Sequence, residues 1–232
     1  MAEIRSGLRH VLAKPTVHDL FQRLVGAYAW RRKFISHFVN PVIREGDKII
    51  DIGCGTGELL RYLPASISYY GFDRNPDYIE SARKHFSGRD ATFECKSVGH
   101  DVGSEYPKFD IALAIGLMHH LDDSDAAMML RSARDILSES GYLFLLDPTF
   151  TPGQSSLSRF VVGKDRGQNV RTPEEYIRLC AEVFPETQCN VDMKPLWIPY
   201  AGVVIRCSSA KLPEVKCGGD RGELPKYCSP RI

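Results

Sequence analysis

The sequence has no long apolar run and no excess of charge of one sign. No stretch reaches the roughly 18 consecutive apolar residues of a membrane-spanning helix, and the first ten residues lack the apolar core of a signal peptide. We therefore expect a cytoplasmic protein. Because 30 Lys and Arg oppose 29 Asp and Glu, the net charge is +1. That balance gives no general attraction to nucleic acid or to an anionic membrane, so no nucleic-acid partner is expected.

The seven cysteines form neither a C-x-x-C pair nor a zinc-binding spacing. We interpret them as reduced thiols that mostly fill the core, and we expect no metal site. The chain also lacks internal repeats, heptads and low-complexity blocks. Its 232 residues, 43% hydrophobic and 25% charged, suit one ordinary globular domain and are too few for two full ones. No oligomeric state follows from the sequence.

What the chain does have is a glycine-rich turn directly after a short apolar strand. The strand is expected to end at Asp51, and Ile52-Gly-Cys-Gly-Thr-Gly57 follows, leading into an amphipathic helix over 58–63. Alternate glycines let the chain turn sharply and let a ligand lie against bare backbone. The spacing differs from the dinucleotide fingerprint G-x-G-x-x-G, and a carboxylate at the strand end repels a pyrophosphate but suits an ammonium group.

A second short apolar strand ends in Asp73, whose carboxylate can accept hydrogen bonds from both hydroxyls of a ribose. A nucleoside that carries an amino acid fits both acids. The segment from Asp51 to Gly57, together with Asp73, resembles the first two motifs of the class I S-adenosylmethionine-dependent methyltransferases. The run F-D-I-A-L-A-I-G-L-M-H-H over 109–120 resembles the fourth-strand motif of that family. The resemblance covers roughly residues 45 to 150 and extends to an uncharacterised bacterial small-molecule subset.

The order of elements predicts an α/β fold. Strand and helix alternate five times before residue 147, which is typical of a doubly wound parallel sheet. The resemblance implies seven strands in all, closed by an antiparallel hairpin over 187–193 and 201–207. A single domain is expected over 1–210, with a helical lid at 16–39 that breaks near Gly26 and a polar insertion at 148–172. Residues 211–232 are expected to form an extended or disordered tail.

The local patterns also predict individual elements. A third strand is expected over 91–95, a helix from the Asp122 cap to about Ser138, a turn at Ser140-Gly141, a strand over 142–146, and a helix that starts at Thr172.

The resemblance implies S-adenosylmethionine as cofactor and S-adenosylhomocysteine as product. At the position of Ser97 the family often has an acid that contacts the adenine amino group. The hydroxyl here leaves that contact to the backbone of Ser97 and Val98. The lid residues are expected to touch the cofactor, and a helix that only packs on the sheet is the alternative. The expected cofactor-binding residues are Gln22, Gly26, Asp51, Gly53, Cys54, Gly55, Gly57, Asp73, Arg74, Ser97, Val98 and Gly116.

Methyl transfer from a sulfonium is a direct displacement, so a base is needed only where the nucleophile carries a proton. His119 follows the fourth strand, and imidazole titrates near neutrality, which makes His119 the candidate catalytic base or hydrogen-bond partner of the acceptor. The alternative is that both neighbouring histidines pack against the lid. The candidate substrate-binding residues are His120, Asp147, Arg166, Arg171 and Tyr200.

The two arginines are expected to clamp an anionic group, with solvated loop charges as the alternative. The predicted function is methyl transfer to an O or N atom of a small molecule, which is anionic if these arginines bind it. The alternatives are a nucleotide-binding oxidoreductase and a cofactor-binding protein without turnover.

Overall fold

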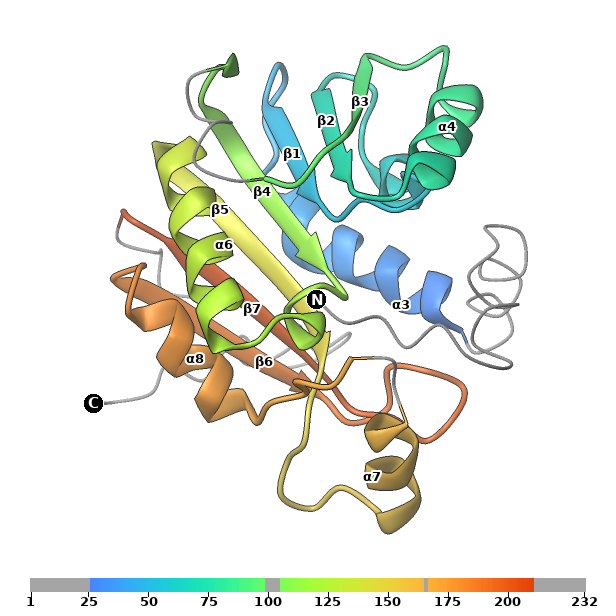
Figure 1. Cartoon of the computed structure of the whole chain (residues 1–232), viewed down its shortest axis with the longest axis vertical. Helices are drawn as coiled ribbons and strands as arrows, with labels where there is room; N and C mark the ends of the chain where they lie inside the picture. The colour runs from blue at the N-terminus through green and yellow to red at the C-terminus, as the bar shows by residue number, and fades with distance from the viewer. Residues whose placement is uncertain (1–25, 99–104, 165–166, 211–232) are drawn as a thin grey trace.

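A seven-stranded sheet runs through the computed structural model, which describes residues 26–98, 105–164 and 167–210 (Figure 1). The strand order is β3-β2-β1-β4-β5-β7-β6. The pairs among β1 to β5 are parallel, and β7 runs antiparallel to both β5 and β6. This arrangement confirms the predicted doubly wound sheet with its closing hairpin. The strands are β1 Lys48–Ile52, β2 Ser68–Asp73, β3 Ala91–Cys95, β4 Phe109–Ile115, β5 Leu137–Pro148, β6 Glu186–Asp192 and β7 Gly202–Ser208.

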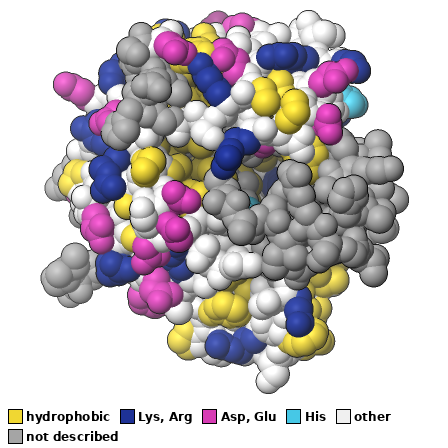
Figure 2. Space-filling model, viewed as in Figure 1, with side chains coloured by type: hydrophobic (Ala, Val, Ile, Leu, Met, Phe, Trp, Pro, Cys, Tyr) yellow, Lys and Arg dark blue, Asp and Glu magenta, His cyan; other side chains and the backbone are white. Residues whose placement is uncertain are grey.

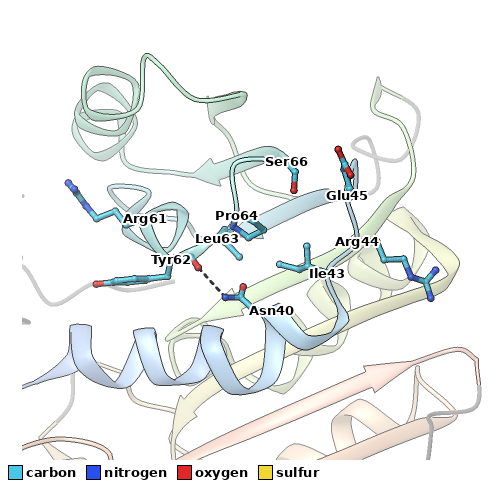
Figure 3. A pocket seen from close by; sticks show the side chains of 9 residues that line it. All are labelled: Asn40, Ile43, Arg44, Glu45, Arg61, Tyr62, Leu63, Pro64 and Ser66. Atoms are coloured by element: carbon cyan, nitrogen blue, oxygen red, sulfur yellow. Dashed lines mark hydrogen bonds between the residues drawn. The ribbon is translucent and has the colours of Figure 1, made fainter.

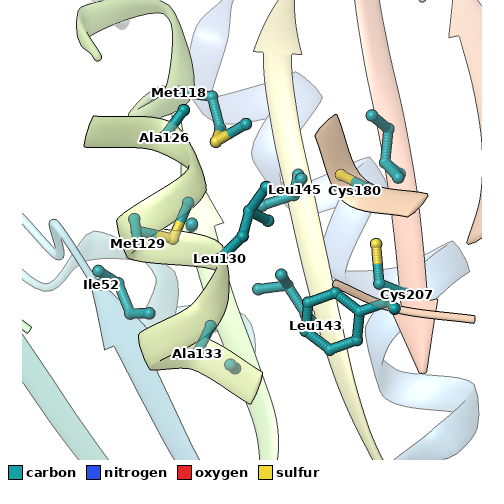
Figure 4. Packing of buried hydrophobic residues seen from close by; sticks show 14 of the residues in the cluster. Ile52, Met118, Ala126, Met129, Leu130, Ala133, Leu143, Leu145, Cys180 and Cys207 are labelled. Carbon is teal, nitrogen blue, oxygen red and sulfur yellow. The ribbon is translucent and has the colours of Figure 1, made fainter. Parts of the chain in front are cut away.

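Helices cover both faces of the sheet and make three layers. The helical elements are α3 Ala27–Phe34, the π-helix η1 Ile35–Val39, the 3-10 helices η2 Asn40–Val42, η3 Glu58–Tyr62 and η4 Met118–His120, and the α-helices α4 Pro76–His85, α6 Asp123–Ile136, α7 Ser156–Gly163 and α8 Pro173–Ala181. One core cluster joins α6 and α8 to one face of the sheet (Figure 4). A second cluster joins α3, η1, η3 and α4 to the other face.

Strand β4 shows why the sequence gives a parallel sheet. Alternate residues of the strand point to opposite faces. Ala112 and Ala114 belong to the core on the α6 side, whereas Ile111 and Leu113 belong to the core on the α3 side, and all four are at most 1% exposed. A strand that is buried on both faces therefore reads as a continuous apolar run.

The predicted helix starts agree with the caps in the structure. The Asp122 side chain accepts a hydrogen bond from the backbone N–H of Asp125 at 2.8 Å, and α6 begins at the next residue. Thr172 and Glu175 form a capping box at the start of α8. These local signals fix where the chain turns back onto the sheet.

Three local expectations differ from the structure. The helix after the glycine turn is the short 3-10 helix η3, because the following Leu63 is extended and precedes a proline, which disfavours helical backbone. The turn expected at Ser140-Gly141 lies within β5, which starts at Leu137: Leu137 pairs with Phe109 and Tyr142 with Ile111, so the chain between them forms an irregularity in the strand. The insertion contains the helix α7, which the sequence pattern did not predict.

The lid is described only in part. Gly26 has a left-handed φ of 84°, and α3 begins directly after it; the helix expected before this break lies outside the described residues. Gln22 and the rest of 16–25 lie outside the described residues, and so does the tail 211–232. Within the described residues, no helix combines the length and the apolar character needed to cross a bilayer.

A hollow of about 430 Å³ lies near the amino ends of β1 and β2 (Figure 3). Its charged side chains, Arg44, Glu45 and Arg61, point away from the hollow, and Asn40 Nδ2 donates to the Tyr62 carbonyl at 3.4 Å. Ligand sites need polar groups that converge on one point. The hollow therefore does not have the character of a ligand site. The predicted site residues that the structure describes lie at the opposite end of the sheet, at the carboxyl ends of the parallel strands.

Candidate active site

The glycine turn is fastened to the neighbouring strand at the carboxyl end of β1. The N–H groups of Gly53 and Cys54 both donate to the Phe72 carbonyl, at 2.8 and 3.0 Å. The N–H of Gly55 donates to Asp73 Oδ2 at 2.9 Å. The turn and the second acid, which the sequence placed on separate strands, are thus in direct contact.

The glycines of this turn are required for different reasons. All three have left-handed φ, between 56° and 77°. A Cβ at Gly57 would lie 2.8 Å from the Phe93 ring, so core packing excludes a side chain there. A Cβ at Gly55 would meet nothing within 4 Å. Open space above Gly55, beside the Asp73 carboxylate, is what a ligand lying against bare backbone needs.

Asp51 is buried behind the turn. The Tyr69 hydroxyl donates to Asp51 Oδ2 at 2.5 Å, and each residue is 1% exposed. Among the described residues, no group lies within hydrogen-bond distance of Asp51 Oδ1. The pKa of this carboxyl is raised to about 7: burial is the largest cause and the charge of Asp73 adds to it, while the Tyr69 hydrogen bond and Arg31 lower the pKa. A cation at Oδ1 would compensate the buried charge.

The other expected cofactor residues lie along the same edge of the sheet. Cys54 is buried, and burial raises the pKa of its thiol, so it is packed rather than reactive. The Cys95 thiol donates a hydrogen bond to the carbonyl oxygen of Arg74, at 3.6 Å. The Ser97 side chain is exposed, and Val98 is half-buried against the core. Gly116 follows β4, and its N–H donates to the Leu146 carbonyl at 2.7 Å.

Gly26 lies under a tryptophan. A Cβ at Gly26 would come within 2.9 Å of the Trp197 indole in the β6–β7 connection. Close packing between the start of α3 and this connection therefore explains the glycine. Tyr200, at the end of the same connection, is buried and meets the Trp30 ring edge-on at 6.5 Å.

The structure brings two of the predicted residues together as a pair. His119 lies in η4 after β4, and Asp147 lies near the end of β5. The distance from His119 Nδ1 to Asp147 Oδ1 is 2.5 Å, and the His119 backbone N–H donates to the same oxygen at 3.1 Å. The two residues are 5% and 1% exposed. The His120 ring centre is 4.1 Å from that of His119.

The insertion folds back over this pair. The N–H of Asn169 donates to the His119 carbonyl at 3.0 Å. A Cβ at Gly167 would lie 2.0 Å from the His119 ring, so only glycine lets the chain pass there. The insertion therefore encloses His119 on a side that the sheet leaves open.

Arg171 has a structural role in place of the anion clamp that the sequence suggested. It is 6% exposed, and Nε and Nη2 both donate to Asp123 Oδ1, at 3.0 and 2.8 Å. Its remaining hydrogen bonds go to the carbonyls of Met118, Leu121 and Asn169. A guanidinium has five N–H donors, and these five hydrogen bonds use all of them. Arg171 thus fixes the segment that carries His119, while Arg166 lies outside the described residues.

Tyr69 and the anchoring role of Arg171 were missed from the sequence. Both act through contacts across long stretches of chain, 18 residues for Tyr69 with Asp51 and 50 for Arg171 with Leu121. No local pattern marks either contact. The adjacency of β4 and β5 in the predicted sheet was the signal that could have paired His119 with Asp147.

Comparison with known proteins supports the class suggested by this geometry. A family model described as a methyltransferase domain matches residues 49–141. A curated relative, the ubiquinone biosynthesis O-methyltransferase of Pelagibacter ubique (strain HTCC1062), is 28% identical over 101 residues. That match covers 42% of this chain and 40% of the relative, so the aligned part spans less than half of either protein.

Solved structures share the fold. The plantazolicin methyltransferase BamL, in complex with a triazolic desmethylPZN analog and SAH, has a TM-score of 0.63 at 17% identity, covering 84% of this chain and 90% of that one. A SAM-dependent methyltransferase of Methanosarcina mazei has a TM-score of 0.57 at 18% identity, covering 75% and 97%. The sheet order and the match to a methyltransferase-domain model over residues 49–141 support a class I S-adenosylmethionine-dependent methyltransferase, as the motifs predicted.

We expect Arg171→Ala to lower the free energy of unfolding by at least about 2 kcal/mol, because it strands buried carbonyls of the His119 segment. Arg178→Ala is the matched control. Arg178 also contacts Asp123, at 3.5 Å, but its side chain is 59% exposed, so the loss should stay below about 1 kcal/mol. Urea unfolding of both variants measures the difference. Equal losses would contradict the anchoring role.

Asp51 should make the ligand-free protein less stable at higher pH. Its folded-state pKa, about 7, lies above the ordinary value, so the folded state binds the proton more tightly and stability falls as pH rises from about 4 to about 7. Between pH 5 and 8 the loss from this one group should be roughly 2–3 kcal/mol. When the free energy of unfolding is measured with urea at several pH values, Asp51→Asn should flatten its decrease with pH, and Asp77→Asn, at an exposed position, should leave that decrease unchanged. If Asp51→Asn shows the same dependence of unfolding free energy on pH as the wild type, Asp51 is not its cause.

Proposed function

We propose that the protein transfers a methyl group from S-adenosylmethionine to an oxygen or nitrogen atom of a small-molecule acceptor. The observation that carries the proposal is the buried His119–Asp147 pair, with 2.5 Å between Nδ1 and Oδ1, at the sheet edge that also holds the glycine turn. When bound, S-adenosylmethionine supplies a methyl group on a positively charged sulfur. The chain's own residues then have to bind the cofactor, orient the acceptor and remove a proton from the acceptor.

The cofactor is held at the ends of β1 to β3 in this proposal. Asp73 accepts from Gly55 and from the N–H of Asn75, and each carboxylate oxygen keeps a second lone pair for a ribose hydroxyl. Asp51 Oδ1, which has no partner among the described residues, takes the ammonium group of the amino-acid end. The backbone of Ser97 and Val98 faces the adenine. The role of Gln22 stays a prediction.

His119 acts as the general base. Asp147 holds the ring by Nδ1, so Nε2 is the nitrogen that takes the proton of the acceptor, and the carboxylate stabilises the imidazolium that results. A hydroxyl acceptor needs this help, because its proton must leave as the new bond forms. A neutral amine already presents a lone pair. The pair therefore favours oxygen over nitrogen, which agrees with the name of the O-methyltransferase relative.

The acceptor-binding residues are proposed at the same end of the molecule. His120 lies beside His119, and Tyr200 forms a buried wall at the end of the β6–β7 connection. With Arg171 committed to the His119 segment, Arg166 is the one of the two predicted arginines that is left as a partner for an anionic acceptor. The buried carboxylate of Asp51 beside the glycine turn argues against the pyrophosphate of a dinucleotide and hence against an oxidoreductase.

Release of S-adenosylhomocysteine from S-adenosylmethionine and a panel of phenols, alcohols and amines tests turnover. We expect His119→Ala to lower kcat by about 10²- to 10⁴-fold, the usual contribution of a general base, with cofactor affinity unchanged in calorimetry. Asp147→Asn should also lower kcat, and the exposed His85→Ala is the control. If the protein binds the cofactor but releases no product with any acceptor, it is a cofactor-binding protein without turnover. Full activity of His119→Ala would contradict the role of His119 as general base.

Gly55→Val should abolish cofactor binding and keep the fold, because its side chain would enter the open space beside Asp73. Gly46→Val is a matched control. Gly46 has a similar left-handed φ, 82°, and equally open surroundings, but it lies at the other end of β1. Both variants carry about the same backbone strain, of order 1–3 kcal/mol. Calorimetry with S-adenosylmethionine compares them, and retained binding in Gly55→Val would show that the turn is only structural.

A further inference from the structure

Exposed hydrophobic side chains gather in two segments near the acceptor side. Among the described residues, five large hydrophobic side chains are exposed. Leu157 and Phe160 lie on α7 and are 59% and 62% exposed, and Met193 and Trp197 lie in the β6–β7 connection and are 40% and 75% exposed. The fifth, Met128, stands apart on α6 and is 48% exposed.

The two segments leave the sheet at the same corner. Pro148 at the end of β5 pairs with Gly202 at the start of β7, and the N–H of Thr149 donates to the Ala201 carbonyl at 3.1 Å. Figure 1 shows α7 and the β6–β7 connection at one end of the molecule, beyond the carboxyl end of β5. We call residues 156–163 and 193–199 together the apolar rim. In the sequence the rim starts nine residues after Asp147 on one side and ends one residue before Tyr200 on the other.

The charged residues of the rim, Arg159 and Lys194, are both basic. The rim together with the adjoining residues 148–155, 164 and 200 contains Arg159, Lys164 and Lys194 and no Asp or Glu, although the whole chain balances 30 basic against 29 acidic residues. The nearest acids along the sequence are Asp165 and Asp192. Arg159 lies 5.4 Å from the Phe150 ring centre, and Lys164 lies 5.5 Å from that of Phe160. Figure 2 shows hydrophobic and basic side chains together over this end.

We propose that the apolar rim docks on an anionic phospholipid surface. Exposed Trp, Phe and Leu side chains beside Lys and Arg suit the boundary between headgroups and acyl chains, where apolar burial and attraction to anionic lipid add together. A second copy of the chain fits less well, because a two-fold interface built on this rim sets like charges against one another.

Docking at the rim turns the acceptor side toward the bilayer. Asp147 lies at the end of β5 and Tyr200 just before β7, the two strands from which the rim segments extend, so an apolar acceptor dissolved in the membrane would reach the site without crossing water. This second step rests on the proposed function. The docking itself does not, and it can be measured without any acceptor.

The test is co-sedimentation of the full chain with phosphatidylcholine vesicles, with and without phosphatidylglycerol. We expect binding to the anionic vesicles only, weaker at high salt. The double variant Leu157→Ser with Phe160→Ser should bind at least about tenfold more weakly, because two buried apolar side chains are lost. Met128→Ser, exposed to a similar degree on α6, should bind like the wild type. The Trp197 emission should shift to the blue with vesicles, and a Trp30→Phe background isolates that signal.

The proposal fails if the wild type does not sediment with anionic vesicles, if it binds neutral vesicles equally well, or if Met128→Ser is as weak as the double variant. Sedimentation velocity without lipid gives a further check. A dimer that the double variant dissociates would assign the rim to a second copy and overturn membrane docking. Calorimetry with S-adenosylmethionine should be unchanged in the double variant, so a failure of docking is distinguishable from a failure of the proposed activity.

Discussion

The hydrogen bond between His119 and Asp147 is the interaction on which the acceptor side of the molecule depends. A carboxylate that is 1% exposed is costly unless it is paired, and both the ring and the backbone N–H of His119 donate to it. That pairing requires β4 and β5 to end side by side. It also requires η4 to hold one conformation, which Arg171 secures through the carbonyls on either side of His119.

The sequence predicted the parts that depend on neighbours along the chain. The burial of β4 on both faces, the Asp122 cap and the glycine turn are all visible in a few consecutive residues. The contacts of Arg171 and Tyr69 are not visible in this way, because their partners lie up to 53 residues away in the sequence. The residues next to an arginine or tyrosine do not show whether its side chain makes such a contact. The helix α7 was missed for a related reason: its two largest apolar residues, Leu157 and Phe160, face water and only Val162 among its apolar residues is fully buried, so it lacks the wide apolar stripe that marks other helices.

Whole-chain charge concealed a local asymmetry. A net charge of +1 argues against general attraction to anionic surfaces, and it describes the average of a chain whose acids and bases are unevenly placed. Over 148–164 and 193–200 the acids are missing, and the structure brings these two stretches to one corner of the sheet. Only the fold, by joining β5 to β7, makes a surface out of two segments that are separate in the sequence.

Trp197 lies between the start of α3 and the exposed surface of the β6–β7 connection. One side of its indole covers Gly26, where α3 starts, while most of the side chain faces solvent at the rim. Because Gly26 has no side chain of its own, the first turn of α3 rests directly on that ring. A displacement of the indole at the surface therefore changes the support of the helix that packs on the far face of the sheet. Trp30 of the same helix meets Tyr200 edge-on, so α3 contacts the β6–β7 connection through two aromatic side chains, one exposed and one partly buried.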